Sequence, residues 1–184
     1  MTGSRRRNIE EQNMKNEYKF DTMTVANPIN LVANSFQYDF PNMVKIRTGK
    51  HGVPKKATKG SAGFDLRADL INTIVVNPNE TVLVSTGLSL ELAEEVCAFI
   101  MPRSGLAYKK GITIPNSPGL IDSDYRGDIC VLLRNDGNEP FIIEDGDRIA
   151  QLMIMPFINP SFVVVDELSN SSRNTGGFGS TGIG

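Results

Sequence analysis

Histidine and cysteine are scarce in this 184-residue sequence, which contains one histidine and two cysteines. The cysteines, Cys97 and Cys130, are far apart and form no CxxC pair, so we predict neither a zinc site nor a disulfide framework. With His51 alone, mechanisms that need a histidine base, a His-Cys pair or a multi-histidine metal cage are nearly excluded. Any chemistry is therefore expected from carboxylates, hydroxyls, backbone amides and arginines.

Long apolar runs and an excess of positive charge are absent as well. No apolar segment approaches the ~18 residues needed to cross a bilayer, so we expect no membrane association. The formal net charge of -2 argues against stable nucleic-acid binding, because such domains usually cluster Lys and Arg and have an isoelectric point above ~9. We expect a cytoplasmic protein, or one in the nucleus or host cytoplasm if the source is eukaryotic or viral.

The remaining composition, 40% apolar and 22% charged residues, is that of an ordinary globular protein. At ~150 residues per domain, the length suggests one compact domain with some chain left over. Residues 1–42 are polar and Asn-rich with little periodicity, so we predict a flexible N-terminal extension there. We place a β-domain over residues 43–168 and a glycine-rich C-terminal arm over residues 169–184.

From Val44 onward, short β-rich runs alternate with strong turn signals. Repeated short strands bounded by Gly, Pro, Asn and Asp favour an all-β sandwich or barrel over a βαβ fold. The region around residues 88–101 has some helical propensity, but the alternation of Leu88, Leu90 and Leu92 favours a strand. One helical turn is expected at residues 104–108. Further strands are expected at residues 73–76, 81–84, 129–133, 141–143, 149–157 and 162–165.

Two segments have the composition of phosphate-binding loops. The run RNTGGFGSTG (173–182) places an arginine, hydroxyls and an aromatic ring among glycines, whose amides can converge on phosphate oxygens. A disordered tail would have the same composition, so both interpretations stay open. The run PRSGLA (102–107) offers a guanidinium, a hydroxyl and amides to one anion, or alternatively a helix cap by Ser104.

Three further segments carry isolated polar residues. The run GLIDSDYRG (119–127) places a carboxylate beside an aromatic ring, an arrangement suited to activating a water molecule. A charged β-turn without a catalytic role would have the same sequence pattern. In DRIAQLMI (147–154), strict alternation would place Arg148 and Ala150 on one face and Gln151 on the other, where it needs a partner if buried. In AGFDLRA (62–68), Asp65 lies alone in an apolar strand.

Taken in order, AGFDLRA, PRSGLA, GLIDSDYRG, DRIAQLMI and RNTGGFGSTG resemble the five ordered motifs of the trimeric dUTPase family. The resemblance covers about residues 44–182, essentially everything except the N-terminal extension. It implies a jelly-roll or distorted β-barrel with at most one short helix, in a homotrimer whose active sites are shared between subunits. It also implies a Mg²⁺-dependent hydrolase that converts dUTP to dUMP and pyrophosphate, keeping uracil out of DNA and supplying dUMP for thymidylate synthesis.

The resemblance assigns a role to each motif. Asp122 would be the general base that activates water for attack on the α-phosphorus, and Tyr125 would pack under the deoxyribose. Mg²⁺ would bind mainly to the triphosphate, with Asp65 acting through a water, and Arg148 would brace the site. The backbone of the hairpin at residues 111–127 would bind the edge of uracil. The motifs PRSGLA and DRIAQLMI would hold the phosphates, and the C-terminal arm would close over the nucleotide. The substrate-binding residues implied are Arg103, Ser104, Gly105, Asn116, Gly119, Leu120, Ile121, Tyr125, Cys130, Gln151, Arg173, Phe178, Gly179, Ser180 and Thr181.

Two alternatives are weighed against this hypothesis. A dCTP deaminase, or a bifunctional form, would need a glutamate for proton transfer at the base, and residues 111–127 contain none. A binding or signalling protein that retains nucleotide recognition is the alternative from another class, and the presence of Asp122, Tyr125 and a complete arm argues against it. The arm has Asn174-Thr175 where many family members have Gly followed by a variable residue, so we expect a stiffer hinge.

Overall fold

A computed structural model of the chain describes residues 43–177 and residue 180. Within these residues the fold is β-rich with one short helix, which confirms the expected fold class. The predicted extension, residues 1–42, lies outside the described residues. The elements are β1 (Lys45–Arg47), β2 (Phe64–Arg67), β3 (Ile74–Val76), β4 (Thr81–Ser85), β5 (Ser89–Glu91), β6 (Val96–Met101), α3 (Ser104–Lys110), β7 (Ile112–Thr113), β8 (Gly119–Ile121), β9 (Cys130–Asn135), β10 (Phe141–Ile143) and β11 (Arg148–Pro156).

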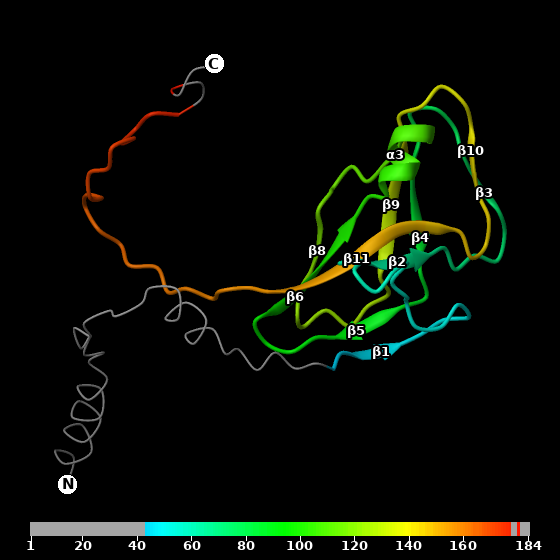
Figure 1. Cartoon of the computed structure of the whole chain (residues 1–184), viewed down its shortest axis with the longest axis horizontal. Coiled ribbons are helices and arrows are strands. Elements are labelled where there is room, and N and C mark those ends of the chain that lie inside the picture. Colours follow the sequence, from blue (N-terminus) through cyan, green and yellow to red (C-terminus); the bar gives the residue numbers. More distant parts are fainter. Residues whose placement is uncertain (1–42, 178–179, 181–184) are drawn as a thin grey trace, which may run out of the picture. The chain divides into compact units, whose positions relative to one another are not determined.

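The strands form small antiparallel sheets (Figure 1). The largest has the order β2-β11-β6-β8, so strands far apart in the sequence become neighbours. A second sheet has the order β4-β9-β7, and the pairs β1-β5 and β3-β10 complete the set. The long strand β11 lies between β2 and β6 in the largest sheet, which places the fourth motif between the first and the second.

The core is formed by the inward faces of these strands. In β9, buried and half-buried residues alternate, as expected for a strand with one face on a core. Its inward residues include Asn135, which is fully buried. The Asn135 amide donates to the carbonyls of Val76 and Glu139, and its oxygen accepts from the Gly137 amide. Because every polar atom of this side chain is bonded, Asn135 ties β3 to the turn after β9 without a desolvation penalty.

The single described helix, α3, confirms the helical turn expected after Pro102 and extends it to Lys110. It ends at Gly111, whose φ of 66° lies in the left-handed region that favours glycine. A Cβ on Gly111 would also lie 2.7 Å from the backbone nitrogen of Gly137, so this position needs glycine for space as well. Among the described residues no helix is long and apolar enough to span a membrane.

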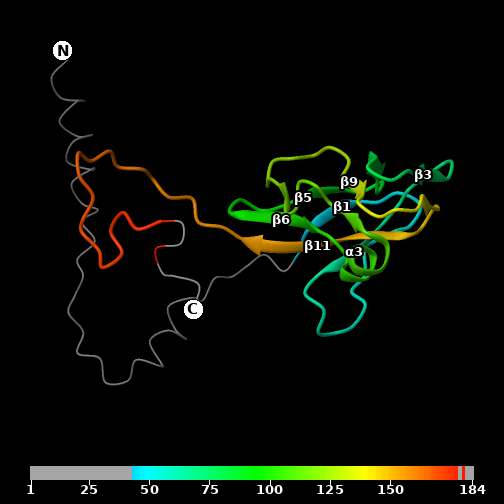
Figure 2. The same ribbon diagram turned by 90° about the horizontal axis from the view of Figure 1, so that it is seen from above.

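Two strand predictions differ from the structure. The region around residues 88–101 is β-structure, as expected, but it forms two strands separated by a turn in which Glu95 has a φ of 62°. The strand expected at residues 162–165 is wrong, because the chain forms no regular element there and Phe162 and Val164 are 94% and 98% exposed. The chain leaves the folded body at the end of β11 (Figure 2). High β-propensity alone does not make a strand without a neighbour to pair with.

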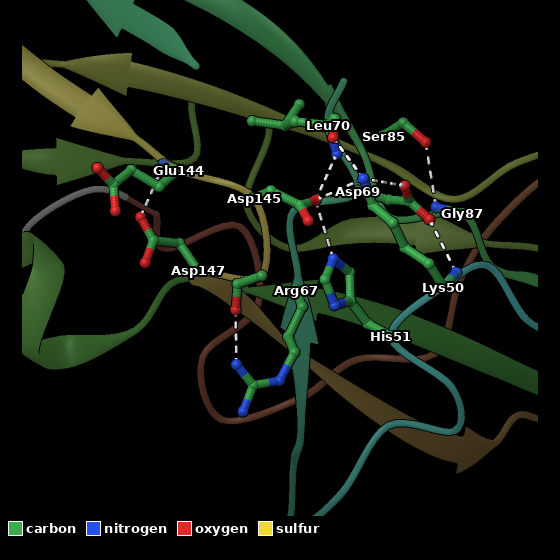
Figure 3. A network of polar contacts seen from close by, with 11 residues as sticks. Lys50, His51, Arg67, Asp69, Leu70, Ser85, Gly87, Glu144, Asp145 and Asp147 are labelled. Atoms are coloured by element: carbon green, nitrogen blue, oxygen red, sulfur yellow. Dashed lines mark hydrogen bonds and ion pairs between the residues drawn. The ribbon is translucent and has the colours of Figure 1, made fainter. Parts of the chain in front are cut away.

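The only histidine takes part in a polar network that joins three segments of the fold (Figure 3). Oδ1 of Asp145, in the turn before β11, lies 2.9 Å from Nε2 of His51 and 2.9 Å from Nζ of Lys50. The same oxygen accepts from the backbone amide of Leu70, also at 2.9 Å. Lys50 lies 3.4 Å from Asp69 as well. The carboxylates of Asp69 and Asp145 thus share one cation, the ammonium of Lys50. These contacts connect the segment after β1 to the loops after β2 and β10.

This network predicts a pH dependence of stability. The hydrogen bonds from the Leu70 amide, Lys50 and His51 lower the pKa of Asp145 from its ordinary value of about 3.9. A carboxyl whose pKa is lower in the folded than in the unfolded state stabilises the fold at pH values above its unfolded-state pKa. This contribution to stability is lost as the pH falls through its folded-state pKa. Asp145→Asn should therefore lower the melting temperature at pH 7, and the gap to wild type should narrow below about pH 4. Thermal unfolding between pH 3 and 7 checks this, with the exposed Asp166→Asn as control. A gap of constant size would contradict it.

Candidate functional site

Asp65 on β2 lies between two arginines. Its Oδ1 is 3.3 Å from Nε of Arg103, just after β6, and its Oδ2 is 3.1 Å from Nη1 of Arg148 on β11. Arg103 also donates from Nη1 to the carbonyl oxygen of Arg148 at 2.8 Å. The Asp65 side chain is only 15% exposed, and two guanidinium groups offset the cost of burying its charge. Because a guanidinium has five N–H donors, Arg103 is oriented here and keeps donors for an anion.

A β-bulge at the start of β11 makes this cluster possible. Arg148 pairs with Arg67 and Ala150 with Leu66, so Ile149 is the extra residue. Ile149 and Ala150 are both buried, at 1% and 0% exposure, whereas Arg148 is exposed. The expectation that Arg148 shares a face with Ala150 is therefore wrong. A bulge re-aims the side chains before it, and here it lets Arg148 reach Asp65.

A cavity of about 250 Å³ adjoins the cluster and is lined by Asp65 and Arg148 among other residues. Its lining also includes His51 and three cationic residues that were not among the predicted site residues, Lys55, Lys56 and Arg67. This excess of positive charge in a concave site suits an anion. For Lys55 and Lys56 the available signal was the basic run KHGVPKK before the first motif, which is typical of an ordinary loop, whereas Arg67 belongs to the first motif itself.

The other predicted phosphate ligands lie next to this cluster. Gln151 pairs with Asp65 across β11 and β2, and its amide donates to the Pro102 carbonyl at 3.4 Å. The half-buried glutamine thus has the partner that its burial requires. Ser104 and Gly105 open α3 and are exposed. The alternative that Ser104 caps the helix is wrong, because no side chain caps α3 and its N-cap residue is Arg103.

The predicted uracil-reading residues lie on and beside β8, an edge strand of the largest sheet. Gly119 is buried and pairs with Ile100, while Leu120 is 56% exposed and Ile121 is half-buried. A Cβ on Gly119 would lie 3.3 Å from Nδ2 of Asn116, so the Asn116 amide folds closely over this glycine. In the described sheet β8 pairs with β6 alone, which leaves its outer backbone groups available for a ligand.

Asp122 and Tyr125 occupy one turn immediately after β8. The Tyr125 amide donates to the Asp122 carbonyl at 3.2 Å, and the Asp122 side chain is exposed. The Tyr125 hydroxyl donates to the Asp128 carbonyl at 2.9 Å, which holds the ring against the turn. The structure thus places Asp122 and Tyr125 in the same turn.

Cys130, at the start of β9, lies near the same turn. Its thiol donates to Oδ2 of Asp128 at 3.3 Å, and the Ser85 hydroxyl donates to that oxygen at 2.6 Å. Burial, followed by the hydrogen bond and charge of Asp128, raises the pKa of Cys130 to about 11. The thiol is therefore protonated at neutral pH and unsuited to nucleophilic chemistry.

The structure does not bring Asp122 close to Arg103 within one chain. Ala98 pairs with Ile121 and Ile100 with Gly119, so continuing the register places Asp122 beside Cys97. The six steps from residue 97 to residue 103 span about 20 Å at ~3.3 Å per residue. One chain therefore carries the carboxylate turn and the two-arginine cluster at different ends of β6.

The C-terminal arm is described in part. Arg173 donates from Nε to the Gly176 carbonyl at 3.0 Å, and the Ser180 amide donates to the Gly177 carbonyl at 2.8 Å. Residues 157–175 are exposed. Three predicted site residues, Phe178, Gly179 and Thr181, lie outside the described residues.

Comparisons with known proteins identify the same family as the motifs. The family model of dUTPase matches residues 50–182. A deoxyuridine 5'-triphosphate nucleotidohydrolase of Shewanella sediminis is 50% identical over 147 residues, which cover 77% of this chain and 97% of that protein. The protein of the same name from Treponema denticola is 53% identical over 131 residues, covering 71% of this chain and 91% of its own length.

Solved structures share the fold. The dUTPase of Staphylococcus bacteriophage 80alpha with dUPNHPP has a TM-score of 0.71 at 27% identity, covering 77% of this chain and 99% of that chain. A mutant dUTPase of phage phi11 of S. aureus, described for its coordination of a structural Mg(II) ion, has a TM-score of 0.62 at 23% identity and covers 68% and 98%. With a family model that spans most of the chain and relatives at half identity, the chain belongs to the dUTPase family.

Proposed function

We propose that this chain hydrolyses dUTP to dUMP and pyrophosphate, with Asp122 as the general base for a water that attacks the α-phosphorus. The observation that carries the proposal is the turn after β8, where an exposed carboxylate and a hydrogen-bonded aromatic ring lie three residues apart. A positioned carboxylate can take a proton from the attacking water. The deoxyribose of dUTP would pack on the ring of Tyr125. This contact would place the α-phosphate of the nucleotide over Asp122. The activity would keep uracil out of DNA and supply dUMP for thymidylate synthesis.

The phosphates would lie at the cationic cluster. Arg103, Ser104 and Gln151 are grouped at the end of β6 and on β11, where their donors can meet phosphate oxygens. Phosphoryl transfer depends mainly on positioning and on charge stabilisation, so a preset guanidinium is the group that the reaction needs. The basic lining of the adjoining cavity, with Lys55 and Arg67, adds to the positive field there.

Magnesium fits this cluster through water rather than by direct ligation. Each oxygen of Asp65 is paired with a guanidinium, at 3.3 Å from Arg103 and 3.1 Å from Arg148, so a direct metal bond would displace an arginine. A carboxylate has about four lone-pair positions, and Asp65 can still accept from a metal-bound water. Magnesium dehydrates reluctantly and is often held by substrate phosphates plus one carboxylate. Bound to the triphosphate, it would neutralise phosphate charge.

The base would be read by the backbone of β8 and its flanking loop. Uracil and cytosine differ by exchanged donors and acceptors, and a mispaired buried polar group costs about 1–3 kcal/mol. An edge strand offers both backbone N–H and C=O groups at fixed spacing, which suits this discrimination. The Asn116 amide, held over Gly119, would complete the contact.

The active sites would be shared in a homotrimer. The backbones of Asp122 and Arg103 lie about 20 Å apart along the direction of β6 in one chain, at ~3.3 Å per residue, which argues against both acting on one α-phosphate. A carboxylate turn from one subunit facing the arginine cluster of another resolves this separation. The exposed apolar residues Phe162 and Val164 support association, because a surface of this kind is usually covered by a partner.

Removing the arm should nearly abolish hydrolysis and leave the fold intact. Truncation after Leu168 deletes Arg173 and Ser180, which would order the γ-phosphate, but removes no strand of the described fold. Misplacement of a substrate by ~1 Å can cost about 10²-fold, so we expect a loss of at least that size. Pyrophosphate release measures the loss, while circular dichroism and size-exclusion chromatography check the folded trimer. A truncated protein with a normal rate would remove the arm from the mechanism.

Pyrophosphate release from dUTP, dCTP, dTTP and UTP, measured in parallel with and without Mg²⁺, tests the proposed function directly. We expect turnover of dUTP with Mg²⁺ and little with the other three nucleotides. Ammonia release from dCTP is measured beside it, because it identifies a deaminase of the same fold. A purified chain that leaves dUTP intact would refute the proposal.

A further inference from the structure

The ring of Tyr125 folds back over its own turn and lies against the backbone of Gly127. A Cβ built on Gly127 would lie 2.6 Å from Cζ and 3.0 Å from Cε2 of this ring, and closer still to the phenol oxygen. Carbon atoms in contact are normally about 3.5–4.0 Å apart. Gly127 is not among the glycines with a positive φ, so this position needs glycine for space rather than for backbone conformation.

The hydroxyl end of the ring is also anchored by Asp128, the residue after Gly127. The Tyr125 hydroxyl donates to the Asp128 carbonyl at 2.9 Å. The Asp128 side chain in turn accepts from the hydroxyl of Ser85 on β4 and from the thiol of Cys130 on β9. One side of the ring thus rests on Gly127, while Tyr125 as a whole remains 44% exposed.

We infer that Gly127 is a specificity-determining positioning residue, which sets the place of the Tyr125 ring and through it the preference for deoxyribose over ribose. The inference rests on the proposed function, in which the sugar packs on this ring. A ring can exclude a 2′-hydroxyl only if it is held to within about 0.5 Å of the required position. The missing side chain at Gly127 lets the ring lie deep enough to meet the sugar closely.

Replacing Gly127 by alanine should move the ring and spare the fold. The atoms that the new methyl group meets belong to the outer end of a partly exposed side chain, which can swing away. We expect a melting temperature within about 2 °C of wild type. The ratio of kcat/KM for dUTP to that for UTP should fall about tenfold, because discrimination by a single small group in a pocket is worth about 10–200-fold.

Ring position can be read independently of activity. The chain has four tyrosines, so incorporation of 3-fluorotyrosine gives a simple ¹⁹F spectrum in which Tyr125→Phe identifies the Tyr125 signal. We expect Gly127→Ala to shift this signal. Gly60→Ala is the matched control, because a Cβ on Gly60 meets nothing within 4 Å and its φ is not positive. The control should change neither the spectrum nor the nucleotide ratio.

Tyr125→Phe gives a second test that does not depend on the folding of Gly127→Ala. It keeps the ring against Gly127 and removes only the hydrogen bond to Asp128, so the nucleotide ratio should stay within about threefold of wild type. A tenfold loss would assign the ring position to that hydrogen bond and overturn the inference. An unchanged ratio or an unmoved signal in Gly127→Ala would overturn it as well. A wild-type chain inactive on dUTP would instead refute the proposed function, and the ¹⁹F shift separates the two failures.

Discussion

Replacing Asp122 by asparagine should remove most turnover while dUTP still binds. The amide matches the carboxylate in shape but cannot take a proton from the attacking water. General-base catalysis contributes about 10²–10⁴-fold, so kcat should fall by that factor. The binding residues on β8, β11 and α3 are untouched, and the dissociation constant of a nonhydrolysable α,β-imido analogue of dUTP should stay nearly unchanged. Single-turnover pyrophosphate release and calorimetric titration measure the two quantities separately.

Asp124→Asn is the matched control, because Asp124 is an exposed carboxylate in the same turn. It carries the same change of charge and should keep near-normal turnover. Equal losses in the two variants would assign the effect to the general negative field of the turn. A near-normal kcat in Asp122→Asn would remove this residue from the role of base.

Two inactive variants should restore each other's activity when their subunits are mixed. Arg103→Ala disables the cationic cluster and Asp122→Asn disables the carboxylate turn, and within one chain the two residues lie at different ends of β6, with backbones about 20 Å apart at ~3.3 Å per residue. In shared sites, a cluster from an Asp122→Asn subunit can face a turn from an Arg103→Ala subunit. With random assembly at equal amounts, about a quarter of the sites would be intact. Co-refolding the two variants and assaying pyrophosphate release measures the recovery.

A mixture of Arg103→Ala with Gln151→Ala is the matched control for this complementation. Both residues belong to the same cluster, since Gln151 bonds to the Pro102 carbonyl beside Arg103. Every cationic cluster then carries either Arg103→Ala or Gln151→Ala, so no recovery of pyrophosphate release is expected. Recovery in both mixtures, or in neither, would contradict sites divided between subunits in this way.

Local elements of the fold followed from turn chemistry. The strand expected at residues 141–143 is β10, and the run at residues 81–84 is β4 with Ser85 added, because Asn, Pro, Gly and Asp bound both segments. The run FVVV at residues 162–165 has the same local propensity but forms no strand, since a strand also needs a neighbour for its backbone hydrogen bonds. Propensity is a local property, and pairing is not.

The residues of the site also fall into those that the sequence predicted and those that only the fold revealed. The resemblance of five ordered motifs to a known family led to Asp65, Arg103, Asp122, Tyr125 and Gln151. The prediction from strand alternation was wrong at Arg148, because one extra residue in β11 reverses the face of the sheet toward which the preceding side chains point. Lys55 was missed because only the fold places its basic loop beside Asp65, and Arg67 was missed although it lies on β2, two residues after Asp65.

From the sequence alone came the kind of chemistry, its family and the residues able to perform it, because these depend on which groups are present and in what order. Tertiary structure alone decided how those groups face one another: the two guanidiniums on Asp65, the ring of Tyr125 on Gly127, and the distance along β6 between Asp122 and Arg103. Such arrangements depend on strand register and close packing between distant segments, and these are properties of the whole folded chain rather than of any short stretch of it.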